Sequence, residues 1–353
     1  MRNILVLGAG RSSAALVNYL LEQSQSQDWR LTLADRQQEF AEKLINGHER
    51  GQAVRMDISD LPAREKLIGS ADLVVSMLPV MHHIDVAKTC LKFRKNLVTA
   101  SYVSHEIDQI RKEVEDAGLL FMKECGLDPG IDHMSAMSMI DNIRSEGGIL
   151  RAFETFTGGL LAPAPDTNPW QYKFTWNPRN VILAGIGGVK FLQEGTYKYI
   201  PYHKVFSRTE MVHIPGYGYF EGYPNRDSLK YLDLYDLHGI KTLYRGTFRR
   251  PGFCRAWDIF VQLGATDDTY LMENVPEMTH RQFINAFLSY NPYDSVELKL
   301  AHYMNLGFNS EEMFRMRWLG MFTDEPVGLE EGSPAGILEH ILKKKWSLVE
   351  QDR

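Results

Sequence analysis

The amino-acid sequence predicts an α/β protein whose N-terminal part is a doubly wound parallel sheet of the Rossmann type. Over the first 125 residues, six short apolar runs alternate with amphipathic stretches, and the first run leads straight into a glycine turn. Apolar strands separated by helices are typical of a parallel sheet covered on both faces, and right-handed crossovers make it doubly wound. The predicted strands are residues 3–7, 31–34, 53–58, 73–78, 97–100 and 119–122, with helices expected at 14–21 and 41–45.

The pattern changes after about residue 150, where glycine, proline and aromatic residues become frequent. Such a composition indicates short strands and long loops, and an apolar helical periodicity returns over residues 279–319. We therefore expect a Rossmann dinucleotide-binding domain over residues 1–125 and an α+β substrate-binding domain over 126–353. The second domain should carry a helical insertion at about 268–330.

Composition narrows the possible functions. The chain has 353 residues and a net charge of −6, whereas nucleic-acid and membrane-surface partners favour a basic stripe. No apolar run approaches the roughly 20 residues that span a bilayer. Three widely separated cysteines fit a reducing cytoplasm, and neither they nor the histidines have metal-ligand spacing. We expect a cytoplasmic protein with no metal and no nucleic-acid or membrane partner.

The glycine turn predicts a dinucleotide site. Gly8 permits a tight turn after the first strand, and Gly10 lets the backbone approach a pyrophosphate at the following helix N-terminus. The third glycine position holds the small Ser13. The second strand ends at Asp35, which can accept hydrogen bonds from ribose hydroxyls and favours NAD, whereas Arg36 could pair with the 2′-phosphate of NADP. We expect NAD as cofactor, with NADP possible.

Three later strands are followed by turn-rich segments at residues 76–79, 99–102 and 126–130. In a parallel sheet these segments lie at the carboxyl edge, where a nicotinamide and its substrate would meet. Proline and glycine are expected in any loop, so the placement of these residues is more informative than their type.

Six strings make the chain resemble the glutamate-forming saccharopine dehydrogenases, also called saccharopine reductases. They occur in the same order and cover essentially the whole chain. The strings are residues 98–103, 126–133, 158–163, 168–169 with 172–176, 222–228 and 245–249.

The resemblance implies a reaction. Saccharopine is a secondary amine that joins the lysine ε-nitrogen to the glutamate α-carbon. Oxidation on the lysine side with NAD(P)⁺ and hydrolysis of the resulting imine release glutamate and 2-aminoadipate 6-semialdehyde, and the reverse reaction belongs to lysine synthesis. The family often pairs through its second domain, which implies a possible homodimer.

The resemblance also implies site residues. Saccharopine has three carboxylates, and the planar fork of arginine suits such groups. The implied cofactor contacts are Gly8, Ala9, Gly10, Arg11, Asp35, Arg36, Asp57, Ile58, Leu78, Ala100, Ser101, Leu127 and Asp128. The implied substrate contacts are Ser101, Tyr102, Lys173, Arg226, Gly246, Thr247, Phe248 and Arg249.

Acid–base chemistry requires a group that can hold or move a proton near the reacting carbon. Asp128 and Tyr102 are the candidate catalytic residues. Fungal relatives carry a cysteine where this chain has Thr157, so we expect no essential acid–base role there. His133 follows the Asp-Pro-Gly turn, and we expect it to be packed on a helix.

Two other functions remain open. Carboxynorspermidine dehydrogenases and homospermidine synthases reduce related imines, but their cationic substrates need acidic pockets. The other is a catalytically inactive nucleotide-binding relative, because the resemblance implies a further C-terminal stretch that this chain lacks.

Overall fold

The computed structural model describes residues 1–162, 168–349 and 352, with the side chain of Arg11 outside the description. The chain forms two compact units, Met1–Asn142 and Ile143–Arg353, called below the N-terminal and C-terminal units. Residue 163, the end of one resemblance string, lies outside the described residues.

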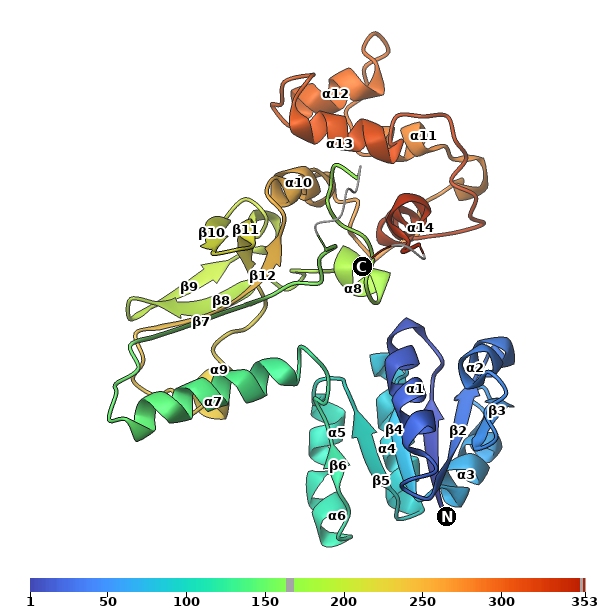
Figure 1. Cartoon of the computed structure of the whole chain (residues 1–353). Helices are drawn as coiled ribbons and strands as arrows, with labels where there is room; N and C mark the ends of the chain where they lie inside the picture. Colours follow the sequence, from blue (N-terminus) through green and yellow to red (C-terminus); the bar gives the residue numbers. More distant parts are fainter. Residues whose placement is uncertain (163–167, 350–351, 353) are drawn as a thin grey trace. The chain divides into compact units, whose positions relative to one another are not determined.

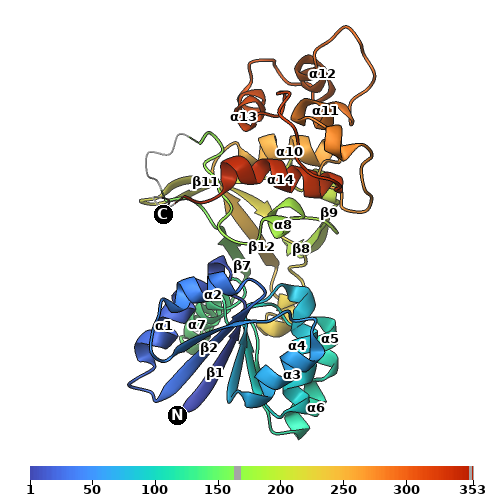
Figure 2. The same cartoon turned by 90° about the vertical axis from the view of Figure 1, so that its right-hand side faces the viewer.

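The N-terminal unit is built on a six-stranded sheet with the order β3-β2-β1-β4-β5-β6 (Figures 1 and 2). All five pairings are parallel. The order reverses direction between β1 and β4, the point at which doubly wound sheets bind ligands. The predicted fold class is confirmed, and each predicted strand has a counterpart. The strands are β1 Arg2–Leu7, β2 Trp29–Asp35, β3 Gly51–Arg55, β4 Leu73–Ser76, β5 Asn96–Thr99 and β6 Phe121–Met122.

Helices cover both faces of this sheet because neighbouring residues of each strand point to opposite sides. Val6 of β1 belongs to a core with residues of α1 and α2, whereas Leu5 and Leu7 belong to a core with α3 and α4. The helices are η1 Arg11–Ser13, α1 Ala14–Gln23, α2 Gln38–Ile45, α3 Leu61–Ser70, η2 Val80–His82, α4 His83–Lys92, α5 His105–Gln109, α6 Arg111–Asp116 and α7 Ile131–Ser145.

The C-terminal unit contains a second, mainly antiparallel sheet with the order β10-β11-β12-β8-β9. β7 pairs with β12 in parallel, so β12 lies at the centre of this unit. The strands are β7 Ala152–Thr157, β8 Val189–Gln193, β9 Thr196–Ile200, β10 Glu210–Ile214, β11 Gly218–Pro224 and β12 Thr242–Arg249.

An aromatic core holds the C-terminal unit together. Trp346, at the end of α14, packs edge-on against Tyr172 and Phe174, with ring centroids 5.1 and 5.4 Å away. Helix α10 adds Phe253 and Trp257 to the same cluster. The predicted helical region contains η4, α11, α12 and α13, whereas α14 was not predicted. The helices are α8 Pro178–Ile182, η3 Tyr202–Lys204, α9 Tyr231–Leu234, α10 Phe253–Leu263, η4 Val275–Glu277, α11 His280–Asn285, α12 Val296–Tyr303, α13 Glu311–Leu319 and α14 Pro334–Trp346.

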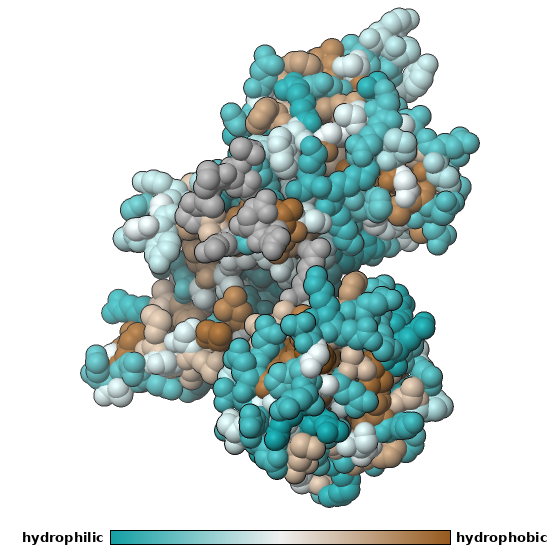
Figure 3. All heavy atoms as spheres, turned by 45° about the vertical axis from the view of Figure 1, so that its right-hand side comes forward, coloured by the Kyte–Doolittle hydropathy of each residue, from teal (hydrophilic) through white to brown (hydrophobic). Residues whose placement is uncertain are grey.

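On the face drawn in Figure 3, hydrophilic residues predominate and apolar patches lie scattered among them. Helix α7 contributes Ile131, Met134, Met139 and Ile143 as exposed apolar side chains. Single exposed apolar residues are common on folded proteins, so these side chains assign no function by themselves.

Candidate functional site

The glycine turn has the geometry that its sequence predicts. Gly8 has φ +102°, a region that side chains disfavour, and a Cβ there would lie 3.0 Å from the carbonyl oxygen of Met77. The buried Ser13 donates its hydroxyl to the Gly8 carbonyl at 2.8 Å, which fastens the start of the helix to the turn. Ser13 therefore meets the packing requirement of the third glycine position.

Asp35 braces this turn. Its Oδ2 accepts a hydrogen bond from the Ala9 amide at 2.8 Å, and its Oδ1 accepts one from the Gln37 amide at 2.8 Å. The carboxylate at the end of β2 thus holds the loop after β1 in place. The neighbouring Arg36 is exposed and makes no hydrogen bond or ion pair with the described residues.

The turn fits a dinucleotide. A Cβ on Gly10 would meet no heavy atom within 4 Å, so the space above this residue is open. Gly10 directly precedes η1, which leads into α1, and the backbone amides at such a helix start favour a phosphate. Of the other implied cofactor residues, Leu78 lies beside Gly8 after β4, and Asp57 and Ile58 follow β3.

The loops after β5 and β6 form the second part of this sheet edge. Tyr102 donates its hydroxyl to Asp128 Oδ1 at 2.5 Å, so the two candidate catalytic side chains are in direct contact. Ala100 lies against Gly126, where a Cβ would come within 3.3 Å of the alanine methyl group. Leu127 is exposed in the same loop.

His133 lies in the first turn of α7, as the sequence predicts. Its Nε2 is 3.1 Å from Glu124 Oε2, and Glu124 Oε1 accepts the Val103 amide at 3.0 Å. The histidine therefore ties the helix to the loop after β6, which is a structural role.

A buried histidine that sequence reasoning missed lies behind Ser101. The ring of His83, the first residue of α4, is hydrogen-bonded to Ser76 through Nδ1 and to Ser101 through Nε2. Burial, helped by the nearby positive charges of Lys123 and His82, lowers the pKa of His83 to about 4. The available signal in the sequence was a histidine placed just after a strand end.

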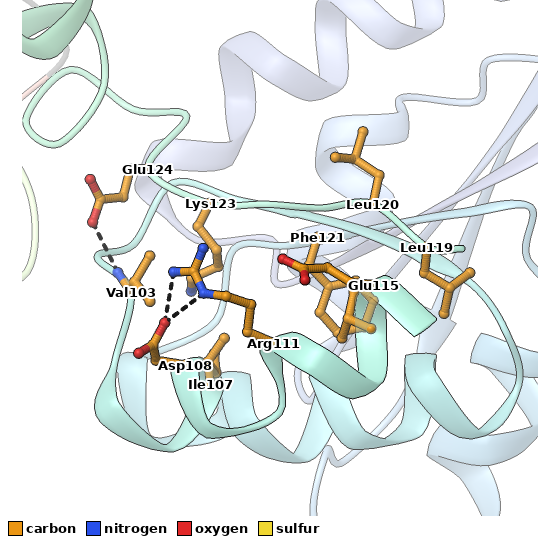
Figure 4. A pocket seen from close by; sticks show the side chains of 11 residues that line it. Val103, Ile107, Asp108, Arg111, Glu115, Leu119, Leu120, Phe121, Lys123 and Glu124 are labelled. Carbon is orange, nitrogen blue, oxygen red and sulfur yellow. Dashed lines mark hydrogen bonds and ion pairs between the residues drawn. The ribbon is translucent and has the colours of Figure 1, made fainter. Parts of the chain in front are cut away.

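Lys123 is itself unusual. Its Nζ is buried without a hydrogen-bond partner among the described residues, and burial lowers its pKa to about 8. The side chain lines a cavity of ≈ 370 Å³ between β6 and the helices α5 and α6 (Figure 4). An Arg111–Asp108 ion pair of 2.7 Å closes part of this cavity. The cavity lining includes no predicted site residue.

In the C-terminal unit, four of the implied substrate residues, Gly246 to Arg249, lie on β12. Arg249 is buried at 6% exposure, and its guanidinium lies 4.9, 5.3 and 5.8 Å from the rings of Tyr172, Phe253 and Tyr223. Its Nη1 donates to the Phe248 carbonyl at 2.9 Å, whereas its Nε has no partner among the described residues. A buried cation without a carboxylate is costly, so an incoming anion would be favoured here.

Two tyrosines beside Arg249 were also missed by the sequence analysis. The Tyr172 hydroxyl is buried without a described hydrogen-bond partner, and burial raises its pKa to about 12. Burial also raises the pKa of Tyr223, while Arg249, the Thr247 side chain and Arg226 each oppose the rise. Tyr223 thus lies near three of the implied substrate residues.

The remaining implied substrate residues differ in their surroundings. Arg226 is exposed with φ +52°, and its side chain makes no hydrogen bond or ion pair with the described residues. Lys173 is half-buried and pairs with Asp352 at 2.8 Å, which already balances its charge. A Cβ on Gly246 would collide with the Phe156 ring at 2.4 Å, so close packing alone explains that glycine. Phe248 stacks on Phe156 at 4.5 Å.

Comparison with known proteins identifies the family. Residues 4–122 match the saccharopine dehydrogenase NADP binding domain, and residues 126–353 match the saccharopine dehydrogenase C-terminal domain. The chain belongs to the saccharopine dehydrogenase family. Its N-terminal unit therefore carries the family's nicotinamide dinucleotide-binding domain, and the predicted resemblance is confirmed.

The individual relatives agree with this assignment. The chain is 32% identical to a saccharopine dehydrogenase [NADP(+), L-glutamate-forming] of Schizosaccharomyces pombe, over 100% of this chain and 79% of the relative. It is 33% identical to the mitochondrial alpha-aminoadipic semialdehyde synthase of Rattus norvegicus, over 97% of this chain but only 37% of the relative. The structure of an apo saccharopine dehydrogenase (L-Glu forming) from Saccharomyces cerevisiae superposes with a TM-score of 0.85 at 27% identity. It covers 100% of this chain and 79% of that one.

The described residues contain neither a membrane-spanning helix nor a metal-binding cluster. Within residues 1–162, 168–349 and 352, no helix has both the length and the apolar character needed to span a membrane. In the same residues, no group of three or more histidine, cysteine, aspartate or glutamate side chains has metal-binding geometry.

Proposed function

We propose that the chain is a nicotinamide-dependent oxidoreductase that cleaves saccharopine to glutamate and 2-aminoadipate 6-semialdehyde, or forms saccharopine from them. The observation that carries the proposal is the 2.5 Å hydrogen bond between Tyr102 and Asp128, located at the sheet edge that also holds the glycine turn. Similarity to glutamate-forming saccharopine dehydrogenases over the whole of this chain supports the same reaction.

The reaction needs proton transfers that this pair can perform. In the oxidative direction, the carbon next to the nitrogen loses a hydride and the nitrogen loses a proton, which leaves a C=N bond. Water adds to this bond, and the resulting carbinolamine collapses to an aldehyde and an amine. The bound nicotinamide supplies the hydride-accepting chemistry. We assign to the Asp128 carboxylate the removal of protons and to Tyr102 the relay through its hydroxyl.

Recognition of the substrate carboxylates falls to the C-terminal unit. The unpaired Nε of Arg249 and the Tyr172 hydroxyl both offer buried hydrogen-bond donors. Arg226 is a second arginine without a described counter-ion. Arginine binds carboxylates through paired N–H donors, and such charge-assisted hydrogen bonds are stronger than neutral ones. These cations favour a polyanionic substrate over a polyamine.

We propose NADP(H) rather than NAD(H) as the cofactor, which revises the sequence-based expectation. Both oxygens of Asp35 accept backbone amides, so the residue acts as a brace for the turn. Arg36 is exposed next to it, as a guanidinium that could pair with a 2′-phosphate. The fungal relatives are themselves named NADP(+)-dependent.

A direct assay tests the proposal. Purified chain is mixed with NADP⁺ and saccharopine, and reduction of the nicotinamide is followed by absorbance, with carboxynorspermidine as the competing substrate. We expect reduction with saccharopine, and Asp128→Asn should lower kcat by about 10²–10⁴-fold, the usual contribution of acid–base groups. Reduction with carboxynorspermidine alone would replace the proposed substrate. Cofactor binding without turnover on either compound would indicate an inactive relative.

A further inference from the structure

A chain of three polar side chains connects the interior of the N-terminal unit to its ligand edge. Ser76 Oγ lies 2.9 Å from His83 Nδ1, and His83 Nε2 lies 2.7 Å from Ser101 Oγ. Ser76 is fully buried at the end of β4, and His83 is 2% exposed. Ser101 is half-buried and directly precedes the candidate catalytic Tyr102. The series of hydrogen bonds from Ser76 through His83 therefore ends at the residue next to the candidate catalytic Tyr102.

The imidazole is neutral under ordinary conditions. Burial is the main cause of its lowered pKa, and Lys123 and His82, both positive when protonated, add to the effect. A neutral imidazole has one nitrogen that donates and one that accepts. One serine hydroxyl therefore donates a hydrogen bond to the ring, and the other accepts a hydrogen bond from it.

Burial of Ser76 indicates which nitrogen donates. A buried hydroxyl hydrogen without an acceptor costs more than an unused oxygen lone pair, and Nδ1 is the acceptor within reach at 2.9 Å. If Ser76 donates to Nδ1, the proton of the ring is on Nε2 and points at Ser101 Oγ. Thr99 Oγ1 also lies near Nε2, but at the longer distance of 3.5 Å. The hydrogen of the Ser101 hydroxyl is then directed away from the ring.

We propose that His83 is a positioning residue that orients the Ser101 hydroxyl as a hydrogen-bond donor to a carbonyl or carboxylate oxygen of the bound ligand. This inference rests on the proposed function, because the ligand oxygen belongs either to the nicotinamide carboxamide or to a substrate carboxylate. The ring itself touches neither ligand; it acts through Ser101.

Two neutral substitutions test the two ring nitrogens separately. The amide of glutamine in His83→Gln can reach the Nε2 position and still donate to Ser101, whereas the shorter asparagine in His83→Asn reaches only the Nδ1 position next to Ser76. Both variants lose the ring and its packing, so a purely structural role predicts similar defects. We compare them with Ser101→Ala, with the double variant His83→Asn/Ser101→Ala and with Ser76→Ala, which removes only the inner hydroxyl.

The readouts are the Kd for NADP⁺, measured by quenching of protein fluorescence, and kcat and KM for saccharopine. We expect His83→Asn and Ser101→Ala each to raise either the Kd for NADP⁺ or the KM for saccharopine by about ten-fold. This is the effect of losing one hydrogen bond to the ligand. The double variant should be no worse than either single variant, and His83→Gln should remain within about three-fold of the wild type. A change in Kd for NADP⁺ identifies the carboxamide as the acceptor, and a change in KM for saccharopine identifies the carboxylate.

Equal defects in His83→Gln and His83→Asn would overturn the inference, as would additive losses in the double variant. If the wild type binds NADP⁺ but does not turn over saccharopine, the proposed function fails. The role of His83 is then tested by the Kd for NADP⁺ alone. An unchanged Kd for NADP⁺ in His83→Asn would then overturn the role of His83. If the wild type binds no dinucleotide, both proposals fail.

Discussion

The two units build their candidate sites in different ways. In the N-terminal unit, the site residues lie in loops after parallel strands, and much of the geometry is backbone: a glycine turn, an open helix N-terminus and a braced loop. In the C-terminal unit, the site is a buried arginine among aromatic rings that come from distant segments. A backbone site leaves a local trace in the sequence, whereas the burial of Arg249 and the rings around it become visible only in the folded unit.

Among the groups that would bind a ligand, the largest effect should come from the C-terminal unit. We expect Arg249→Met to lower kcat/KM for saccharopine about 10³-fold, since the variant lacks the buried guanidinium that would bind a substrate carboxylate. The Kd for NADP⁺ should stay within two-fold. Arg250→Ala is a matched control, because Arg250 lies on the ring of Phe220 and outside the aromatic group around Arg249. Loss of cofactor affinity in Arg249→Met would contradict the assignment of cofactor binding to the N-terminal unit and of substrate recognition to the C-terminal unit.

A pair of glycine substitutions tests the backbone site. Gly10→Ala places a methyl group in open space, so we expect normal thermal stability but about a 100-fold weaker Kd for NADP⁺. Gly8→Ala places a Cβ 3.0 Å from a carbonyl oxygen at φ +102°, so it should also destabilise the fold, by about 1–3 kcal/mol. Unchanged cofactor affinity in Gly10→Ala would contradict the placement of the pyrophosphate.

The buried His83 makes stability depend on pH. Its folded pKa of about 4 lies below the ordinary value of 6.5, so between these values the unfolded chain binds a proton that the folded chain does not. The free energy of unfolding should therefore fall as the pH drops from 6.5 to 4, by about 2–3 kcal/mol. Urea titrations of wild type and His83→Gln across this range provide the test, since carboxyl groups titrate in both proteins. Parallel profiles would show that His83 makes no such contribution.

The smallest effect concerns the choice of cofactor. We expect Arg36→Ala to weaken NADP⁺ binding by about ten-fold and leave NAD⁺ unchanged, because only NADP carries the 2′-phosphate. Asp35→Ala should weaken both cofactors, since it removes the brace on Ala9. If Asp35→Ala instead improves NADP⁺ use relative to NAD⁺, the carboxylate reads the ribose, as the sequence first suggested.

Much of the N-terminal unit could be predicted from its sequence. Alternating apolar runs located its six strands, and strand ends located the Tyr102–Asp128 pair, because parallel strands deliver their carboxyl ends to one edge. The role of Asp35 could not be predicted in the same way. Its carboxylate is able to bind a ribose or a backbone amide, and only the folded loop shows that it accepts the Ala9 amide.

The sequence by itself determined the fold class, the glycine turn and the family, because strand periodicity, turn chemistry and ordered strings are local properties of the chain. Only the tertiary structure decided which polar side chains are buried and what they face. The ring of Tyr172 contacts both Arg249 and Trp346 although the three residues are far apart in sequence, and His83 of α4 reaches Ser101 after β5. Burial and contact depend on packing between segments. They set the pKa values, and they leave the Nε of Arg249 without a hydrogen-bond partner among the described residues.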